Sequence, residues 1–326
     1  MTHNLEVVEL LPLPDKSGVQ MLWRNPPSFR PRSGEYVKIQ LPWLSHGGKE
    51  WHPFSIYLKE STKRGWSSVH GLDSYGILVD GIFEEEVTLE DFIKSVLMSE
   101  FQSKSINDIS SPIIKEARED LGKRYETTQI FINPAGDWSK GLLEELQKQR
   151  QLRACWVRGP YISPYTIVQS FSHVILTATG IGITPALGVM GQYPGFSRTK
   201  ILIWTTREIN TLKFFAPLVS DAHLAIIFYT GTEKLDEETA QTVRSFGNIY
   251  LQQSRPDSLP DIIELIIVNF ENHLHLLNAN SLEMIDSSNK ASWCVLYCGR
   301  SFKIKDELKT FSRANGVSFE YELFDW

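Results

Sequence analysis

Residues 174–185 read VILTATGIGITP, and this stretch decides the fold of the second half of the chain. Its apolar beginning is typical of a strand that is buried on both faces. The glycines that follow let a backbone approach a pyrophosphate, and the helical run after them begins with N–H donors and partial positive charge. The pattern predicts a strand–turn–helix unit that can bind a dinucleotide, with a tight packing turn as the alternative. The residues placed for this role are Gly180, Gly182, Ile183, Thr184 and Pro185.

Similar apolar runs, separated by helix-like runs, recur further along at residues 201–205, 224–229 and 293–297. Strands of this composition are usually covered by helices on both faces, so the pattern predicts a doubly wound parallel sheet. We expect this α/β unit to span residues 167–326. Cys298 and Gly299 follow the last apolar run, which places them at the same edge of the sheet as the glycine turn.

The strand at residues 201–205 is followed by Thr206 and Arg207, and Lys213 comes shortly after. In a doubly wound sheet, this strand end faces the ribose of a bound adenosine. An acidic residue there would suit a ribose 2′-hydroxyl, whereas an arginine can form a bidentate pair with a phosphate. We interpret the pattern as a preference for NADPH over NADH, with a solvated surface arginine as the alternative.

The first half of the chain has a different pattern. Strand-like runs, separated by turns, occupy residues 18–23, 35–41 and 51–58. Short strands with few helices predict an antiparallel β-barrel, which we place at residues 1–166. Residues 84–120 differ, because apolar side chains there follow helical spacing. We expect this helical insertion to cover the barrel, with a docking helix for a partner as the alternative.

Two short motifs in the first half are candidates for binding a flat cofactor and its phosphates. The first is His52, Pro53, Phe54 and Ser55, and the second is Gly136, Trp138 and Ser139. In the first, an aromatic ring and a hydroxyl group held by a proline can meet a flavin ring and its edge. In the second, a turn opens an amphipathic helix, where a backbone N–H and a hydroxyl can bind phosphate. An ordinary strand and an ordinary capped helix are the alternatives.

Composition excludes several functions. The formal net charge of −6 argues against a nucleic-acid partner, which requires a basic face. The three cysteines form no CxxC or Cys/His pattern, so we expect no metal site. No apolar run is long enough to span a membrane, and the N-terminus lacks the pattern of a signal peptide. We therefore expect a cytoplasmic protein, or the cytosolic portion of something larger at the face of a membrane.

The chain ends in an aromatic segment, YELFDW, at residues 321–326. Chain ends normally fray, so an aromatic-rich terminus directly after a strand indicates that it is docked. Phe324 and Trp326 are the two residues that could act at the site. Simple packing of both on the core is the alternative.

Taken in order, these motifs resemble the dehydrogenase domain of the ferric reductase and NADPH oxidase family, within the ferredoxin–NADP reductase superfamily. HPFS, GDWS, RGPY, TGIGITP and YCG occur in the expected order and spacing, over roughly residues 5–326. The resemblance implies an FAD-binding barrel and an NAD(P)H-binding sheet. It also implies that hydride passes from NADPH to FAD, and that single electrons then pass to the haem of a membrane domain, a ferric chelate or oxygen.

For the barrel, the resemblance implies that Phe54 packs against the isoalloxazine with Ser55 near N5, and that residues 136–139 hold the FAD pyrophosphate. Two positions depart from the pattern. His52 and Asn133 stand where relatives often place arginines for the pyrophosphate. Phosphate binding would then depend on backbone N–H groups.

For the sheet, the resemblance implies that residues 180–185 hold the nucleotide pyrophosphate and that Cys298 lies near the nicotinamide. Trp326, or Phe324, would cover the flavin face where nicotinamide enters. Ile162 departs from the family's GPYG pattern. The departures leave a second hypothesis open, in which the chain is a non-catalytic regulatory or binding module built on a degraded reductase fold.

Overall fold

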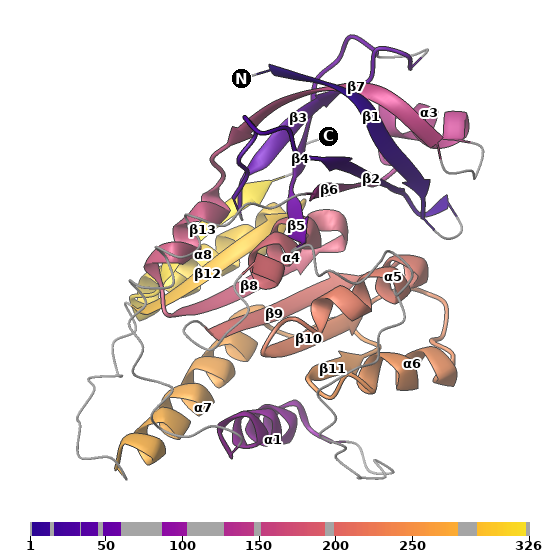
Figure 1. The fold of residues 1–326 in the computed structure, drawn as a ribbon. Helices are drawn as coiled ribbons and strands as arrows, with labels where there is room; N and C mark the ends of the chain where they lie inside the picture. The colour runs from indigo at the N-terminus through magenta and orange to yellow at the C-terminus, as the bar shows by residue number, and fades with distance from the viewer. Residues whose placement is uncertain are drawn as a thin grey trace.

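The protein folds around two sheets, an upper and a lower one in Figure 1. The structure is a computed structural model that describes residues 2–13, 16–32, 34–44, 48–59, 87–102, 127–146, 151–192, 199–279 and 292–323. The upper sheet is antiparallel and formed by the first half of the chain, whereas the lower sheet is parallel and formed by the second half. The predicted fold class, an antiparallel barrel followed by a Rossmann-like α/β unit, is confirmed.

The antiparallel sheet consists of β1 (Thr2–Pro12), β2 (Val19–Arg24), β3 (Tyr36–Gln40), β4 (His52–Ser55), β5 (Tyr57–Lys59), β6 (Thr127–Ile132) and β7 (Gln151–Tyr161). Their spatial order is β4-β3-β7-β1-β2-β6-β5. Only Ile56 separates β4 from β5, yet these strands lie at the two ends of that order. The sheet must therefore curl until its edges approach each other, which makes it a barrel.

The single strand predicted over residues 51–58 is thus wrong, because the chain changes edge in its middle. The Ile56 N–H donates to the Glu35 carbonyl at 3.2 Å, and the Ile56 side chain is 1% exposed. Alternation along β3 behaves as predicted, since Val37 and Ile39 are fully buried in the barrel core. Helix α3 (Asp137–Leu146) packs Leu142 and neighbouring apolar side chains on that core.

The parallel sheet consists of β8 (His173–Thr179), β9 (Thr199–Thr206), β10 (Leu224–Tyr229), β11 (Ile249–Gln252), β12 (Trp293–Gly299) and β13 (Ser318–Leu323). Their spatial order is β11-β10-β9-β8-β12-β13. The chain thus builds outward from β8 in one direction and then returns to the other side of β8. In open α/β sheets, ligands bind beside the carboxyl ends of the strands at such a reversal, which here lies between β8 and β12.

Helices cover both faces of this sheet. The face toward the barrel carries a short 3₁₀ segment, η3 (Pro164–Ser170), together with α4 (Ile183–Gln192), α5 (Ile209–Val219) and α6 (Glu237–Arg244). The other face carries α7 (Leu259–Ala279) and α8 (Phe302–Asn315). None of the helices in the described part of the chain is long and apolar enough to span a bilayer.

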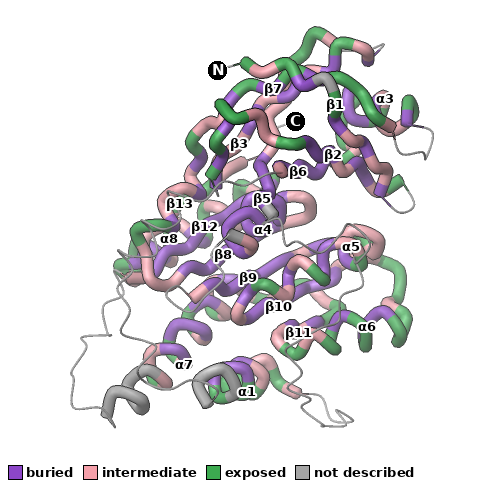
Figure 2. Tube along the Cα trace, viewed as in Figure 1, coloured by how far each residue is buried: buried purple, intermediate pink, exposed green. Residues whose placement is uncertain are grey.

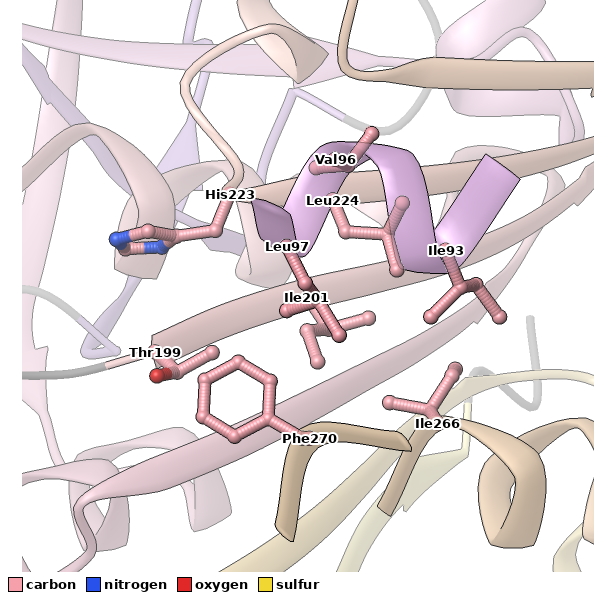
Figure 3. Close-up of a pocket in the computed structure, with 9 residues that line it drawn as sticks. All are labelled: Ile93, Val96, Leu97, Thr199, Ile201, His223, Leu224, Ile266 and Phe270. Carbon is pink, nitrogen blue, oxygen red and sulfur yellow. The ribbon is translucent and has the colours of Figure 1, made fainter. Parts of the chain in front are cut away.

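Part of the predicted helical insertion forms α1 (Leu89–Gln102). We expected this helix to cover the barrel, and that expectation is wrong. Its buried residues, Ile93, Val96 and Leu97, pack in the core on the far face of the parallel sheet. Figure 3 shows Ile93 and Leu97 directed toward Ile201 of β9 and Ile266 of α7, around a small apolar hollow. The helical stripe was predicted from spacing alone, and spacing does not specify which sheet the stripe covers.

One of the hydrophobic clusters spans the junction between the two halves. Tyr57 of β5 and Phe131 of β6 belong to the cluster that also holds α4 and α5. The rings of Phe131 and Phe215 meet edge to face, with centroids 5.0 Å apart. A Cβ atom on Gly191 of α4 would lie 2.9 Å from the Tyr57 ring, so the helix sits directly on the barrel. The barrel and the sheet are therefore held by close packing across their junction.

We expect acid to weaken the far face of the sheet through His173. Its ring stacks on Trp293 at 4.6 Å, and burial lowers its pKa from 6.5 to about 4. The folded protein therefore binds fewer protons than the unfolded chain between these values, so unfolding becomes easier as pH falls from 6.5 toward 4, by up to about 3 kcal/mol.

The measurement is urea unfolding of wild type and His173→Gln at several pH values. The difference in unfolding free energy between the two should be constant above pH 6.5 and should shrink below it. A difference that does not change with pH would show that His173 keeps an ordinary pKa.

Candidate functional site

The glycine turn lies at the carboxyl end of β8, as predicted. Gly180 adopts a positive φ of 53°, a conformation that favours glycine. The indole N–H of Trp204, at the end of β9, donates to the Gly180 carbonyl at 2.9 Å. Residues 180–182 form the 3₁₀ segment η4, and α4 begins at Ile183 with Thr184 and Pro185 buried in its first turn. A hydrogen bond from the neighbouring strand β9 therefore holds the turn in place directly before α4 begins.

The ends of β8 and β12 approach so closely that only glycine fits. A Cβ atom on Gly182 would lie 2.4 Å from the Cys298 carbonyl oxygen, and one on Gly299 would lie 2.0 Å from the Thr179 hydroxyl. The Tyr297 hydroxyl lies in the same place and accepts a hydrogen bond from the Ser301 N–H at 3.0 Å. The reversal point of the sheet is thus a backbone-lined edge without protruding side chains at these two glycines, the surface that a pyrophosphate or a flat ring can approach.

Cys298 ends β12 at this edge, but its side chain is fully buried. Burial, and next the nearby Glu322 carboxyl, raise the pKa of the Cys298 thiol well above its usual range. Glu322 stands opposite Cys298 in the β12–β13 register, and burial raises its pKa as well. Tyr165 of η3 is fully buried beside both of them. The sequence reading missed Glu322 and Tyr165, because parallel register and the position of η3 are not visible in local patterns.

The motif at residues 52–55 forms β4 and contacts the second barrel motif directly. Trp138 lies with its ring centroid 4.4 Å from that of His52 and 5.9 Å from that of Phe54. His52 Nε2 lies 3.0 Å from a Glu50 carboxylate oxygen. Phe54 and Pro53 remain partly exposed, whereas Ser55 is buried. The structure therefore brings together the two motifs that the sequence places more than 80 residues apart.

The loop before α3 leaves backbone accessible. A Cβ atom on Gly136 would meet nothing within 4 Å, and Asn133 nearby is exposed. The Ser139 hydroxyl accepts from the Gly136 N–H at 3.1 Å and donates to the Gly136 carbonyl at 3.0 Å. The hydroxyl thus holds the loop in shape, which leaves the first turn of α3 as the source of N–H donors.

Helix α4 connects the two candidate cofactor regions. It begins at the glycine turn, and about 7.5 Å along its axis, at Gly188, it meets the barrel. A Cβ atom on Gly188 would lie 2.7 Å from the carbonyl oxygen of Ile56, the residue that follows Ser55. Helix α4 therefore connects the turn at residues 180–185 to the strand at residues 52–55, and its close contact with Ile56 fixes the distance between them.

At the end of β9, Arg207 is exposed beyond the last strand residue. The Thr206 hydroxyl, by contrast, is buried and makes no hydrogen bond within the described part of the chain. Lys213 of α5 lies 3.6 Å from Asp236, and both side chains are about half exposed. Of the three predicted phosphate-binding residues, Thr206 is thus buried and Lys213 lies beside a carboxylate, whereas Arg207 is exposed at the end of β9.

The other predicted positions are Ile162, which follows β7, and the aromatic residues at the C-terminus. Ile162 is 79% exposed just after β7, so the departure from GPYG lies at the surface. Phe324 and Trp326 lie outside the described residues, and their predicted role at the flavin face stays a prediction. Among described side chains, no group of three or more His, Cys, Asp or Glu residues is arranged to hold a metal ion.

Comparison with known proteins gives matches in both sequence and structure. No family model matches the chain. It is 24% identical over 186 residues to NADPH oxidase 5 of Homo sapiens, a match that covers 56% of this chain and 20% of that protein. It is 25% identical over 167 residues to the putative respiratory burst oxidase homolog protein H of Arabidopsis thaliana, covering 51% of this chain and 15% of that protein. The chain thus spans about a fifth or less of these relatives.

A solved structure covers all of the chain. Full-length CYP116B46 from Tepidiphilus thermophilus superposes with a TM-score of 0.51 at 11% identity, and the match covers 100% of this chain and 29% of that one. At this identity, the likeness concerns the fold alone. The sequence matches confirm the resemblance that the ordered motifs predicted: this chain is similar to the NADPH oxidases and the respiratory burst oxidase homologues.

Proposed function

We propose that the chain is an NADPH-dependent flavoprotein oxidoreductase, in which residues 1–166 bind FAD and residues 167–326 bind NADPH. One observation carries the proposal: the contact between Gly188 and Ile56 holds the glycine turn of the parallel sheet against the Phe54–Ser55 strand of the barrel. Two cofactors bound at these places would meet at the junction of the halves. The sequence similarity to NADPH oxidase 5 supports the same activity.

The residues present fit both cofactors. Gly182 and Gly299 form a cradle that a Cβ atom would fill, which suits the pyrophosphate and nicotinamide of NADPH. Gly136 leaves the start of α3 open for the FAD pyrophosphate, while the partly exposed ring of Phe54, backed by the buried Trp138, offers an aromatic face beside it. FAD supplies the chemistry, because a flavin accepts hydride as a pair of electrons and can pass electrons on singly.

The protein's own contribution is to bind, orient and exclude water. Phe54 would fix the plane of the flavin ring, and Ser55 would offer a hydroxyl at its edge. The rigid α4 contact would hold the two binding regions in a fixed relative position, so that the nicotinamide and flavin rings are oriented for hydride transfer. Cys298 does not take part in proton transfer, because burial raises the pKa of its thiol and keeps the thiol neutral. A neutral, buried region beside the rings would help to exclude water from the place where hydride is transferred.

The reduced flavin can pass its electrons to any acceptor that takes them one at a time. A haem of a membrane domain, a ferric chelate or oxygen would each accept electrons singly. We propose a cytoplasmic location, where the chain could act alone or at the cytosolic face of a membrane that carries such a domain. The relatives are named as oxidases, which favours oxygen over a ferric chelate as the acceptor.

The deciding experiment is anaerobic mixing of the FAD-loaded protein with NADPH while the flavin absorption band is followed. Bleaching of the band, and its return on addition of ferric chelate or oxygen, is the expected result. A protein that keeps no flavin absorption band once unbound FAD has been removed would instead indicate the non-catalytic module.

We predict that FAD binds more tightly than FMN. Only FAD carries the pyrophosphate and adenosine that the open turn at Gly136 and the first turn of α3 can bind. Flavin fluorescence titration measures both affinities under one set of conditions. Equal affinities would mean that the turn does not contact the pyrophosphate.

We predict that Arg207→Ala weakens NADPH binding by about 1.5–3 kcal/mol, the range for a hydrogen bond to a charged group. NADH binding should barely change, because NADH lacks the 2′-phosphate. Nucleotide titration of the oxidised protein measures both. The matched control is Arg244→Ala, another exposed arginine, in the last turn of α6. Equal losses for NADPH and NADH would assign Arg207 a structural role.

A further inference from the structure

The buried side chain of Trp204 connects the centre of the parallel sheet to the glycine turn. Figure 2 shows β8 and β9 as buried, purple stretches in the middle of that sheet. Trp204 lies near the end of β9 and is 0% exposed, yet its indole N–H donates to the carbonyl of Gly180, which is partly exposed. The nitrogen and oxygen atoms are 2.9 Å apart, the ordinary length of an N–H···O hydrogen bond. A side chain of the core therefore holds the backbone of the proposed nucleotide site.

Close packing holds the indole ring in this position. Ala178 of β8 stands directly opposite Trp204 in the strand register, and Gly180 follows Ala178 by two residues. Because the side chain of Ala178 is only a methyl group, it leaves room for the indole to reach across β8 to the turn. The Phe215 ring of α5 meets the indole edge to face, with centroids 6.3 Å apart. The packed ring therefore has a fixed direction in which to donate its N–H.

This hydrogen bond determines which way the peptide unit between Gly180 and Ile181 faces. The peptide is trans, so its carbonyl and its N–H point in opposite directions. Because the Gly180 carbonyl is turned toward Trp204, the Ile181 N–H points away from the buried indole. The Ile183 N–H also donates to the Gly180 carbonyl, but it shares its proton with the Ile181 carbonyl and so defines the orientation less sharply. Trp204 thus supplies, from outside the turn, the contact that selects one orientation.

Glycine at position 180 makes this orientation easy to lose. Gly180 has a φ of 53°, and a glycine adopts positive and negative φ about equally readily. Without an external contact, the peptide after it could rotate and turn its carbonyl oxygen away from the core, where the partial negative charge would repel a phosphate. With the N–H in that direction, the same peptide attracts a phosphate. The turn therefore requires glycine for its shape and an external donor for its direction.

We propose that Trp204 is a positioning residue for the nicotinamide nucleotide. Its indole N–H holds the peptide between Gly180 and Ile181 so that the Ile181 N–H is presented to the pyrophosphate before the nucleotide binds. Such preorganisation increases affinity, because the turn does not have to be ordered on binding. The inference rests on the proposed function, which assigns the nucleotide pyrophosphate to the glycine turn. It goes further, because it makes a residue buried in the core responsible for part of the affinity.

The test is calorimetric titration of the full chain with NADP⁺, NAD⁺ and adenosine 2′-phosphate. Trp204→Phe removes the N–H and keeps an aromatic ring. NADP⁺ and NAD⁺ should both bind about three- to tenfold more weakly, the equivalent of one hydrogen bond. Adenosine 2′-phosphate should bind as it does to the wild type, because it has no pyrophosphate. Arg207→Ala should give a different pattern, in which NADP⁺ and adenosine 2′-phosphate bind more weakly and NAD⁺ does not.

Two further proteins separate the hydrogen bond from the packing of the ring. Replacement of Trp204 by benzothienylalanine keeps the size of the indole but puts sulfur in place of the N–H, and it should cause the same loss as Trp204→Phe. Trp293→Phe is the matched control, because Trp293 is 1% exposed in the same sheet, at the amino end of β12. This control should bind all three ligands like the wild type. Near-UV circular dichroism should show that every variant is folded.

The possible results distinguish this inference from the proposed function. Wild-type affinity for NADP⁺ in the benzothienylalanine protein would overturn the inference and leave the proposed function standing. Equal losses of NADP⁺ and adenosine 2′-phosphate binding in that protein, or losses as large in Trp293→Phe, would do the same, because they would indicate general damage to the sheet. A wild type that binds none of the three ligands would contradict the proposed function, and the inference with it.

Discussion

The contact between α4 and the point where the barrel changes edge is the constraint on which the rest of the arrangement depends. A backbone-to-backbone approach at Gly188 and Ile56 leaves no space for a side chain, so neither partner can shift without opening a gap. Everything that could bind a cofactor is attached to one side of this contact or the other. The glycine turn precedes α4 directly, and Ser55 precedes Ile56 directly. The relative position of two sites from distant parts of the sequence is thus determined by a helix of only 10 residues.

The ionisable side chains buried at the junction are kept uncharged, although the proposed ligands of this site are charged nucleotides. Cys298, Tyr165 and Glu322 lie close together beneath the strand ends, and burial disfavours the charged form of each. Such groups do not compete with bound phosphates for the cationic and N–H donors near the surface. Under the proposed function, exposed positions such as Arg207 would recognise the charged phosphates, whereas the interior remains neutral. This division is consistent with a protein whose role is to position rings instead of transferring protons.

Local patterns predicted the parts of the fold that are determined locally. The glycine turn, the parallel strands and the alternation of β3 follow from the spacing of neighbouring residues, and all lie where the sequence indicates. The break at Ile56 was not predictable, since the alternation runs through it and only closure of the barrel bends the chain. Tertiary contacts also bury the Thr206 hydroxyl and place Lys213 beside Asp236. Local sequence patterns predict neither of these positions. The register that brings Glu322 beside Cys298 is likewise a property of the assembled sheet.

The position of α1 affects how the molecule can be divided. Lys59 and Thr127 pair across β5 and β6, so the intervening chain leaves and re-enters the barrel at neighbouring points. In between, α1 covers Ile201 and Leu224 on the far side of the other sheet. A fragment cut at the domain boundary would therefore contain every parallel strand and still lack a helix of its own core. The two halves are distinct in architecture, but the core of the second includes a helix that the first half of the chain supplies.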